Sequence, residues 1–407
     1  MSDVVETTCT IVGGGPAGMM LGYLLARAGV DVVVLEKHAD FLRDFRGDTI
    51  HPSTMEIMAD LGLLDDFLKL PHQPTPQIYG RFGDEVIPVA DFSKLPVRAP
   101  YIAMMPQWDF LNFLAERARA HPHFKLYMQA EATGLVLKDG RPDAVSVRTP
   151  NGEMVVRSRL IVACDGRGSI IRQAAGLEVV DLGAPMDVLW FRLSRQPGDT
   201  DETQGRFDVG RIFIMLNRGD YWQCAYVIPK DANDEIRARG LPAFRDGLRP
   251  LLNVDPSRAD ELTDWDQIKL LVVQVNRLKT WWRSGLLCIG DAAHAMSPVG
   301  GVGVNLAVQD AVAAANILAE PLRAGTLNDT HLDAVQRRRE WPTKATQFVQ
   351  VQIQKRVIAQ TLAQPQGGAP TEMRLPLLVR LLARFPFLRR FPARLIGMGV
   401  RPEHPRV

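Results

Sequence analysis

The N-terminal part of the chain contains the pattern that most restricts how it can fold. A β-branched run at residues 8–12 leads into the turn Gly13-Gly-Gly-Pro-Ala-Gly18, and a run of helical apolar density follows at residues 19–28. A second β-rich run at residues 30–35 ends in Glu36. Strand, glycine turn, helix, strand and acid, in this order, are typical of the βαβ unit that binds a dinucleotide. We therefore expect an α/β fold built on a parallel sheet.

Each residue type in this unit has a physical reason. Gly13 permits the tight turn, Gly15 lets the backbone approach a pyrophosphate, and Gly18 lets helix and strand pack closely. Glu36 is placed to accept hydrogen bonds from the ribose hydroxyls of an adenosine. The pattern does not distinguish FAD from NAD. The residues expected to bind the dinucleotide here are Gly13, Gly15, Pro16, Ala17, Gly18, Glu36 and Lys37.

A second nucleotide-type turn lies in the middle of the chain. An apolar run at residues 160–164 ends at Asp165-Gly166, and a Gly-Arg-Gly turn opens a short helix that carries Ser169 and Arg172. An aspartate at a strand end beside glycine suits contact with ribose or pyrophosphate. Arg172 could fix Asp165 by a charge-assisted hydrogen bond. The alternative is a structural ion pair that caps a helix.

A third unit of this kind begins near residue 286. The apolar run at residues 286–289 stops at Gly290-Asp291, passes through a Pro and Gly loop at residues 298–303, and becomes helical from about Asn305. Asp291 would sit at the carboxyl end of a buried strand. The loop glycines lack side chains, so the backbone can approach a flat ligand and offer N–H groups at a helix N-terminus. The alternative is an ordinary glycine-rich connection.

Between these units the pattern changes to short β-rich runs. One excursion covers residues 78–99, and a second contains the runs 187–194, 205–216 and 221–229. They predict a separate antiparallel sheet. Strand alternation points Arg211, Phe213 and Met215 the same way, so they form a set. The candidates for substrate contact on the inner face of this sheet are Arg192, Arg211, Phe213, Met215, Trp222 and Tyr226.

Composition excludes several classes of protein. With 407 residues the chain is long enough for about two or three domains. A net charge of +2 without a basic, aromatic-rich cluster argues against nucleic acid, and no stretch reaches the roughly 18 uninterrupted apolar residues of a membrane span. The start of the chain lacks the basic region of a secretory signal, so we expect a cytoplasmic protein. The cysteines show neither metal spacing nor a disulfide framework: Cys9, Cys164, Cys224 and Cys288.

Helical patterns dominate after residue 326. Residues 331–362 form one long polar helix candidate, and residues 373–398 are rich in Leu and Arg and broken by three prolines. From Glu372 onward there are about eight arginines against two acids. Such a basic amphipathic tail could touch a membrane surface or a partner. We favour the interpretation that its Leu and Phe face packs onto its own domain.

With the three units in this order, the chain resembles the class A, single-component FAD-dependent aromatic hydroxylases of the p-hydroxybenzoate hydroxylase fold. The turn at residues 13–18 matches the first dinucleotide motif of that family, Asp165-Gly166 its central Asp-Gly motif, and residues 290–305 its second FAD motif. The resemblance spans roughly residues 7–345. It implies a Rossmann-like FAD-binding domain of the GR2 type, an antiparallel β-sheet substrate domain and C-terminal helices. The implied boundaries are 1–75, 102–180 and 281–345 for FAD, 76–101 and 181–280 for substrate, and 346–407 for the helical segment.

The resemblance also implies roles for residues. Glu36 would bind the adenosine ribose, Asp291 the ribityl or pyrophosphate portion, and Arg46 and Gln107 would flank the flavin, although Arg46 could equally lie in a solvated loop. The catalytic candidates are Pro298, near the reacting carbon, with Arg46 and His51. The remaining implied FAD contacts are Asp165, Gly166, Pro298, Gly301, Gly303, Val304 and Asn305.

The implied reaction is a hydroxylation. NADH or NADPH would reduce FAD, O2 would add as a flavin C4a-hydroperoxide, and an aromatic or polyketide-like substrate would receive the oxygen atom. If the substrate is a phenol, His51, His294 or Tyr226 could assist its deprotonation. The resemblance leaves a monomer or a homodimer open. The alternatives are an FAD-dependent reductase of isoprenoid double bonds without oxygen insertion and a non-catalytic FAD-binding protein.

Overall fold

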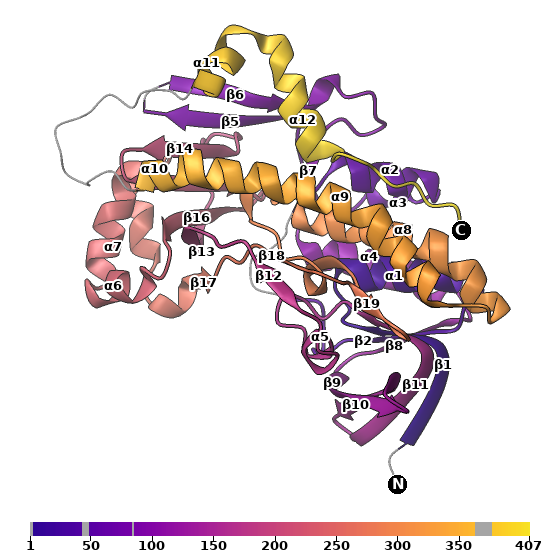
Figure 1. Cartoon of the computed structure of the whole chain (residues 1–407). Helices are drawn as coiled ribbons and strands as arrows, with labels where there is room; N and C mark the ends of the chain where they lie inside the picture. The colour runs from indigo at the N-terminus through magenta and orange to yellow at the C-terminus, as the bar shows by residue number, and fades with distance from the viewer. Residues whose placement is uncertain (1–2, 43–48, 84, 363–376) are drawn as a thin grey trace.

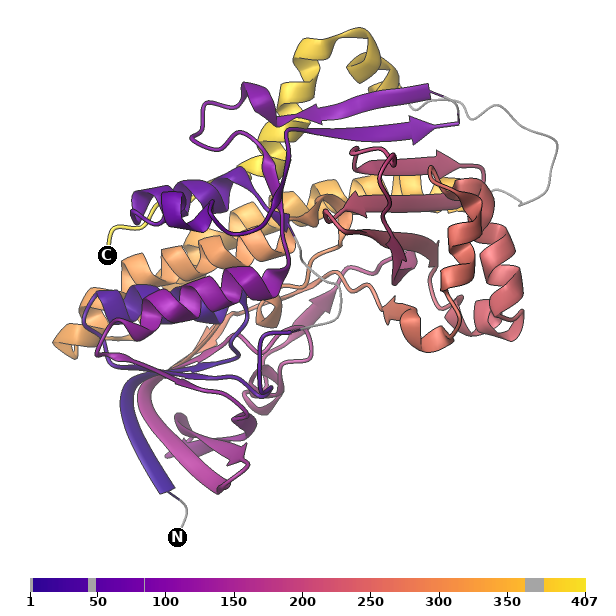
Figure 2. The same ribbon diagram turned by 180° about the vertical axis from the view of Figure 1, so that it is seen from behind.

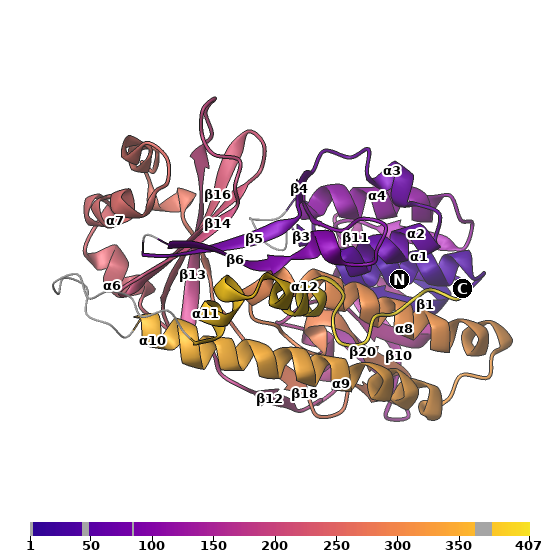
Figure 3. The same ribbon diagram turned by 90° about the horizontal axis from the view of Figure 1, so that it is seen from above.

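The structure, a computed structural model, describes residues 3–42, 49–83, 85–362 and 377–407. Two sheets lie side by side, and the long helix α9 (Asp329–Ile353) runs along both (Figures 1 and 3). Figure 2 shows the same arrangement from behind, with helices covering the sheet that contains the N-terminal strand. The mixed α/β class predicted from the sequence is confirmed.

The first sheet carries the N-terminal strand and is parallel through its centre. Its order is β19-β20-β11-β1-β2-β8, with a hairpin of β9 and β10 attached to β11. The central strand β2 is buried along its whole length, as expected for an inner strand of a parallel sheet. The bounds are β1 (Asp3–Val12), β2 (Val32–Leu35), β8 (Phe124–Tyr127), β9 (Glu131–Lys138), β10 (Arg141–Thr149), β11 (Gly152–Ala163), β19 (Trp282–Arg283) and β20 (Leu286–Cys288).

Three helices bury the apolar residues of this sheet: α1 (Pro16–Arg27), α4 (Gln107–Arg119) and α8 (Gly303–Ala324). Every residue of α1 from Ala17 to Ala26 is buried. Among the described residues, the segment Val299–Ala324 is long and apolar enough to cross a membrane, but 72% of its apolar window is buried inside the protein. It is therefore a core helix.

The second sheet is formed by both excursions, in the order β17-β13-β16-β15-β14-β5-β6. It is not wholly antiparallel as predicted, because β5 pairs with β14 in parallel. These two strands belong to different excursions, so no hairpin fixes their relative direction. The bounds are β5 (Gln77–Phe82), β6 (Glu85–Asp91), β13 (Met186–Ser194), β14 (Gln204–Asp208), β15 (Arg211–Asn217), β16 (Tyr221–Pro229) and β17 (Lys269–Leu271).

Two predicted strands are each divided in the structure. The run at 205–216 is broken at Gly210, which has a φ of 72° and forms the β14–β15 turn. The sequence also predicts a strand over residues 268–278, which the structure divides into β17 and β18 (Asn276–Leu278), and β18 pairs with β12 (Val179–Asp181). A small sheet, β3-β7-β4, lies at the junction and leads into helix α2 (Pro52–Asp60). Its strands are β3 (Thr49–Ile50), β4 (Gln73–Thr75) and β7 (Ile102–Met104).

The predicted long polar helix is confirmed as a continuous helical run. Helix α9 passes into a π-helical turn, Gln354–Ile358, and then into α10 (Ala359–Leu362). Two short helices follow, α11 (Leu377–Arg384) and α12 (Arg390–Gly397), and both pack against β6. Helices α6 (Asn233–Ala238) and α7 (Leu241–Leu248) lie against the second sheet (Figure 1).

Candidate functional site

The three sequence units meet at one edge of the parallel sheet. Gly13 follows β1, Glu36 follows β2, Asp165 comes after β11, and Asp291 comes after β20. Because β20, β11, β1 and β2 are parallel neighbours in this order, their carboxyl ends lie side by side. Ligands of open α/β sheets bind at this edge.

The glycines of the first turn divide into two kinds. A Cβ on Gly18 would lie 1.9 Å from the carbonyl oxygen of Gly13, and a Cβ on Gly13 would lie 2.4 Å from the carbonyl oxygen of Cys164. Both positions therefore exclude side chains for packing reasons. A Cβ on Gly15 would meet nothing within 4 Å. Since Gly15 caps the N-terminus of α1, this open space suits a diphosphate.

Glu36 is buried and is held by its neighbours. One carboxylate oxygen accepts from the backbone N–H of Gly14 at 3.0 Å. The other accepts from the backbone N–H of His38 at 3.0 Å, and the His38 ring lies 2.6 Å from it. His38 was not foreseen, because nothing local predicted that its ring folds back. Lys37 is exposed beside this group.

Asp165 has one satisfied and one unsatisfied oxygen. Its Oδ2 accepts from the backbone N–H of Ile171, at the start of helix α5 (Ile170–Ala174), at 3.3 Å. Its Oδ1 is buried and has no hydrogen-bond partner in the part of the chain that the structure describes. Burial raises the pKa of Asp165, although hydrogen bonds from Ser169 and the backbone oppose the rise. A buried acceptor at this edge fits a hydroxyl of a ligand.

Arg172 does not fix Asp165 in the predicted way. Its guanidinium donates to the carbonyl oxygens of Ala292, at 3.0 Å, and Arg167, at 2.6 Å. Arg167 in turn donates to Asp291 at 3.4 Å. The two arginines therefore join the second and third sequence units.

The turn that carries Asp291 packs closely against two helices. A Cβ on Gly290 would lie 3.1 Å from the Cβ of Ala17 and 3.3 Å from that of Ala307. The Asp291 side chain itself is one-third exposed. It can therefore reach a ligand while its backbone is held in the core.

A buried charge network supports this turn from behind. Asp310 of α8 accepts from the backbone N–H of Gly290 at 3.1 Å, and His294 and Arg339 lie 2.6 Å and 2.8 Å from its carboxylate. Arg339 also donates to Glu403 at 3.2 Å. Burial alone would raise the pKa of Asp310, but the charges and hydrogen bonds of His294 and Arg339 lower it.

The loop after Pro298 is shaped by two glycines with positive φ, Gly300 at 81° and Gly301 at 63°. Thr49 donates to the carbonyl oxygen of Gly301 at 3.1 Å, and a Cβ on Gly301 would lie 2.6 Å from the Thr49 hydroxyl. The loop then enters α8 through Gly303 and the buried Val304.

Asn305 joins α8 to the segment before α2. Its Oδ1 accepts from the backbone N–H of His51 at 2.8 Å and from the Thr54 hydroxyl at 2.7 Å, and its Nδ2 donates to the carbonyl of Thr49 at 3.2 Å. The side chain is thus engaged within the protein. Its role at the pyrimidine edge of a flavin stays a prediction.

His51 has the surroundings of a structural residue. It is fully buried, and its Nδ1–H donates to the carbonyl oxygen of Ile396 at 2.8 Å. Burial lowers its pKa to about 4, which the hydrogen bond to Ile396 only partly offsets. The ring is therefore neutral at pH 7 and a weak base.

We expect the low pKa of His51 to make stability depend on pH. In the unfolded chain the imidazole has an ordinary pKa near 6.5, so between pH ~6.5 and ~4 the unfolded state binds the proton first. Stability should fall by about 3 kcal/mol as the pH drops through this window. His51→Asn keeps the donor but does not titrate, so its unfolding free energy should show a flatter profile. His123→Asn, at an exposed site, should keep the wild-type slope; equal slopes in all three proteins would refute the assignment.

Three buried glutamines of the long helical run hold the loop that contains Pro298. Gln347 donates to the carbonyl of Ala295 at 3.1 Å. Gln350 donates to the carbonyls of Ser297 and Val299 at 3.0 and 2.9 Å and accepts from the Ser297 N–H at 3.2 Å. Gln354 donates to the Ser297 hydroxyl at 2.8 Å. We call Gln347, Gln350 and Gln354 the glutamine ladder.

The second sheet has two different faces. Ile212 and Ile214 lie in an apolar cluster that includes Val299, beside Pro298. Phe213 and Met215 alternate with them and lie in the opposite cluster, which Phe244 of α7 covers. The alternation was predicted correctly, but the structure does not bring this set together with Pro298.

The other substrate candidates also divide between the faces. Tyr226 packs on Phe213 and Phe244, and burial raises its pKa. Arg211 donates to the carbonyl of Gly247 in α7 at 3.4 Å. Arg192 pairs in register with Gln223 on the Val299 side, where its guanidinium lies 4.3 Å from the centre of the Tyr221 ring. Arg46 lies outside the described residues, and Gln107 is the first residue of α4.

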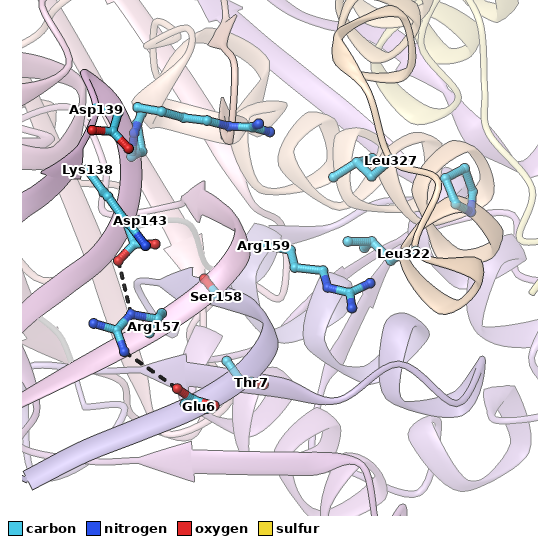
Figure 4. Close-up of a pocket in the computed structure, with 14 residues that line it drawn as sticks. Glu6, Thr7, Lys138, Asp139, Asp143, Arg157, Ser158, Arg159, Leu322 and Leu327 are labelled. Carbon is cyan, nitrogen blue, oxygen red and sulfur yellow. Dashed lines mark hydrogen bonds and ion pairs between the residues drawn. The ribbon is translucent and has the colours of Figure 1, made fainter.

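A surface hollow exists at the other end of the parallel sheet (Figure 4). It is lined by Glu6 and Thr7 of β1, by Arg157 and Arg159 of β11, and by residues after α8. Arg157 is paired with Asp143 and Glu6. Since Glu6 and Thr7 precede the carboxyl end of β1, this hollow is separate from the edge that carries the nucleotide motifs.

This fold and this edge define a dinucleotide-binding protein, and comparison with known proteins assigns its family. The model of the FAD binding domain family matches residues 6–349, so the chain belongs to that family. It is 31% identical, over 88% of its length and 86% of the relative's, to 6-methylpretetramide 4-monooxygenase of Streptomyces rimosus. It is 28% identical to rifampicin monooxygenase of Streptomyces venezuelae over 76% of this chain and 62% of that protein.

A solved structure gives the same fold. The p-nitrophenol 4-monooxygenase of Pseudomonas putida matches with a TM-score of 0.79 over 98% of this chain and 100% of its own, at 21% identity. At this identity the likeness concerns the fold alone. Together with the two sequence relatives, the family assignment makes the chain an FAD-dependent monooxygenase, as the resemblance implied.

Proposed function

We propose that this enzyme uses NADH or NADPH and O2 to hydroxylate a phenolic, polycyclic aromatic compound of the polyketide type. The observation that carries the proposal is the meeting of the three nucleotide motifs at one sheet edge, next to an apolar sheet face that contacts Val299. The substrate class is favoured by the relative that shares 31% identity over most of both chains, a monooxygenase of 6-methylpretetramide. The GR2-type arrangement and the domain boundaries given above belong to the same proposal.

The residues at the edge fit FAD. Gly15 leaves space at the N-terminus of α1 for the diphosphate, and Glu36 lies at the end of the neighbouring strand for the adenosine ribose. Asp165 has an unpartnered buried oxygen for a ligand hydroxyl, and Asp291 is exposed enough to take the ribityl or pyrophosphate portion. Bound there, FAD would supply electron transfer from the nicotinamide and activation of O2.

The protein itself would position the substrate and exclude water from the site. The glutamine ladder holds the backbone of residues 295–299 and so fixes the position of Pro298. In the cluster that includes Val299, Trp190 and Ile214 are only partly buried, so they would offer an apolar surface that excludes water from an aromatic ring. We therefore propose that the substrate lies against this face, with Arg192 at its polar end. On this proposal the opposite face of the sheet, which α7 covers, has a structural role and does not contact the substrate. Its residues include Arg211, Phe213, Met215 and Tyr226.

The function is tested on the purified yellow protein. We would follow NADH and NADPH oxidation, O2 uptake and product formation. The panel contains simple phenols, phenols with an anthracene or naphthacene skeleton, and isoprenoid diphosphates. A polycyclic phenol should stimulate both nicotinamide oxidation and O2 uptake and gain one oxygen atom. Nicotinamide oxidation without O2 uptake, with reduction of an isoprenoid, would establish the reductase instead. No stimulation by any compound would remove the proposed substrate class.

Asp291→Ala should lose FAD while the protein stays folded. The carboxylate is one-third exposed and pairs only with Arg167 among the described residues, so its removal costs the core little. We expect FAD affinity to fall by at least about ten-fold, as for one charge-assisted hydrogen bond. Asp208→Ala is the control, since Asp208 pairs with Arg206 at similar exposure away from the edge. Stoichiometric FAD in purified Asp291→Ala would count against the assigned role.

A further inference from the structure

The C-terminal helices expose aromatic side chains that the sequence led us to place in the core. Leu382, Ala393 and Gly397 are buried against the second sheet, so an inner face packs as expected. The outer face carries three phenylalanines: Phe385 is 42% exposed, Phe387 60% and Phe391 56%. We call the segment Leu377–Gly397, comprising α11, the turn and α12, the C-terminal hairpin.

The three phenylalanines form one patch. The rings of Phe385 and Phe387 lie 6.1 Å apart edge to face. Phe391 lies four residues after Phe387, in the first turn of α12, and we take it together with the ring pair as the aromatic patch of the hairpin. An apolar patch of this kind on a soluble protein marks a site of interaction.

The charged side chains of the C-terminal hairpin itself all have one sign. Arg380, Arg384, Arg390 and Arg394 are exposed, and two of them lie over rings of the patch: Arg384 is 6.0 Å from the centre of Phe385, and Arg390 is 5.1 Å from that of Phe391. The sequence has no acid between Glu372 and Glu403. Arg389 is used differently, since it donates to the carbonyls of Leu382 and Ala383 at the end of α11.

We propose that the C-terminal hairpin binds the surface of an anionic lipid bilayer. Apolar rings that enter the interface beneath a collar of arginines are the features by which an amphipathic helix lies in a membrane surface. A row of anionic headgroups complements four exposed arginines that have no acid beside them in the sequence. A second copy of this chain would meet the same rings, but it would bring arginines against arginines and so does not explain the uniform charge.

The proposal is tested on the FAD-bound full chain by co-sedimentation with vesicles. The wild-type protein should bind vesicles that contain phosphatidylglycerol, bind vesicles of phosphatidylcholine alone far more weakly, and be released by salt. Replacing Phe385, Phe387 and Phe391 together by Ala should weaken binding on the order of 100-fold. Changing Arg380 and Arg390 to Gln should weaken it about 25-fold, at about five-fold for each arginine. FAD content and nicotinamide oxidation in solution should stay at the wild-type level in both variants.

The matched control changes exposed aromatics of α9, Trp341→Ala with Phe348→Ala, which are 58% and 64% exposed. This variant should bind vesicles as the wild type does. Failure of the wild type to bind phosphatidylglycerol vesicles, or undiminished binding by the triple phenylalanine variant, would overturn the proposal. The proposal would also be overturned if the wild type did not bind vesicles but formed a concentration-dependent dimer that the triple variant cannot form. The hairpin would then be a self-association surface.

Discussion

Asp310→Asn should lower the free energy of unfolding by about 3–5 kcal/mol, the cost of breaking a buried ion pair. Asp310 is fully buried and satisfies three donors at once: the N–H of Gly290, the ring of His294 and the guanidinium of Arg339. The variant leaves the positive charge of Arg339 with Glu403 alone. Because Gly290 directly precedes Asp291, we also expect FAD affinity to fall at least about ten-fold.

The measurement is chemical unfolding of the apoprotein, with FAD titration alongside. Asp60→Asn is a close control, since Asp60 also contacts an arginine and a histidine, Arg98 and His404, but at the surface. It should change stability by about 1 kcal/mol or less. Since the folded-state pKa of Asp310 is lowered, its contribution should be complete above pH ~4 and lost as the pH falls further. Equal effects of Asp310→Asn and Asp60→Asn would mean that the network is not a support of the turn.

Gly18→Ala and Gly15→Ala should separate packing from cofactor binding. A Cβ at position 18 would lie 1.9 Å from a backbone oxygen that cannot move without opening the turn, so Gly18→Ala should destabilise the apoprotein by about 3 kcal/mol or more. At position 15 the φ is −74° and the space is open, so Ala should leave the apoprotein unchanged within about 0.5 kcal/mol.

Both variants should bind FAD weakly, for different reasons. In Gly18→Ala the turn is displaced, whereas in Gly15→Ala a methyl group takes the space where the diphosphate would approach. We expect at least a 100-fold loss of affinity in the latter, about 2.7 kcal/mol. Apoprotein melting and FAD fluorescence titration measure the two quantities. Wild-type affinity in Gly15→Ala would mean that the diphosphate does not approach this residue.

What was predictable from the sequence was local. The strands and helices around Gly13 and Asp291 were placed within a few residues, because a buried strand, a glycine turn and a helix start each leave their own signal. The alternation of β15 showed that Phe213 and Met215 share a face. Which face would meet Val299 depends on where α7 returns to cover the sheet, and no residue of β15 encodes that.

The supports behind the site were missed for a related reason. Gln347, Gln350 and Gln354 follow one another at helical spacing, but glutamine on a helix is ordinarily solvated, so the sequence predicts only a polar helix face there. Their side-chain amides instead form hydrogen bonds with the backbone of the loop at residues 295–299, as a neighbouring strand would do. The recurrence of these polar residues along one stripe of a long helix was the signal that could have indicated their buried role. Arg339 gave no such signal, since its two acidic partners, Asp310 of α8 and Glu403, are far from it in the sequence.

The parallel pairing at the cofactor edge also governs how the protein is made. Asp3 pairs with Met154, and Ile161 pairs with Leu286, so these neighbouring strands are far apart in the sequence. Such contacts close slowly, whereas the antiparallel strands β15 and β16 are adjacent in the sequence and can pair early. At roughly 5–20 residues per second, the ribosome exposes the apolar strand β1 for many seconds before β20 and α8 emerge. FAD can therefore be captured only after β20 and α8 have emerged, and its supply would affect how much of the newly made chain escapes aggregation.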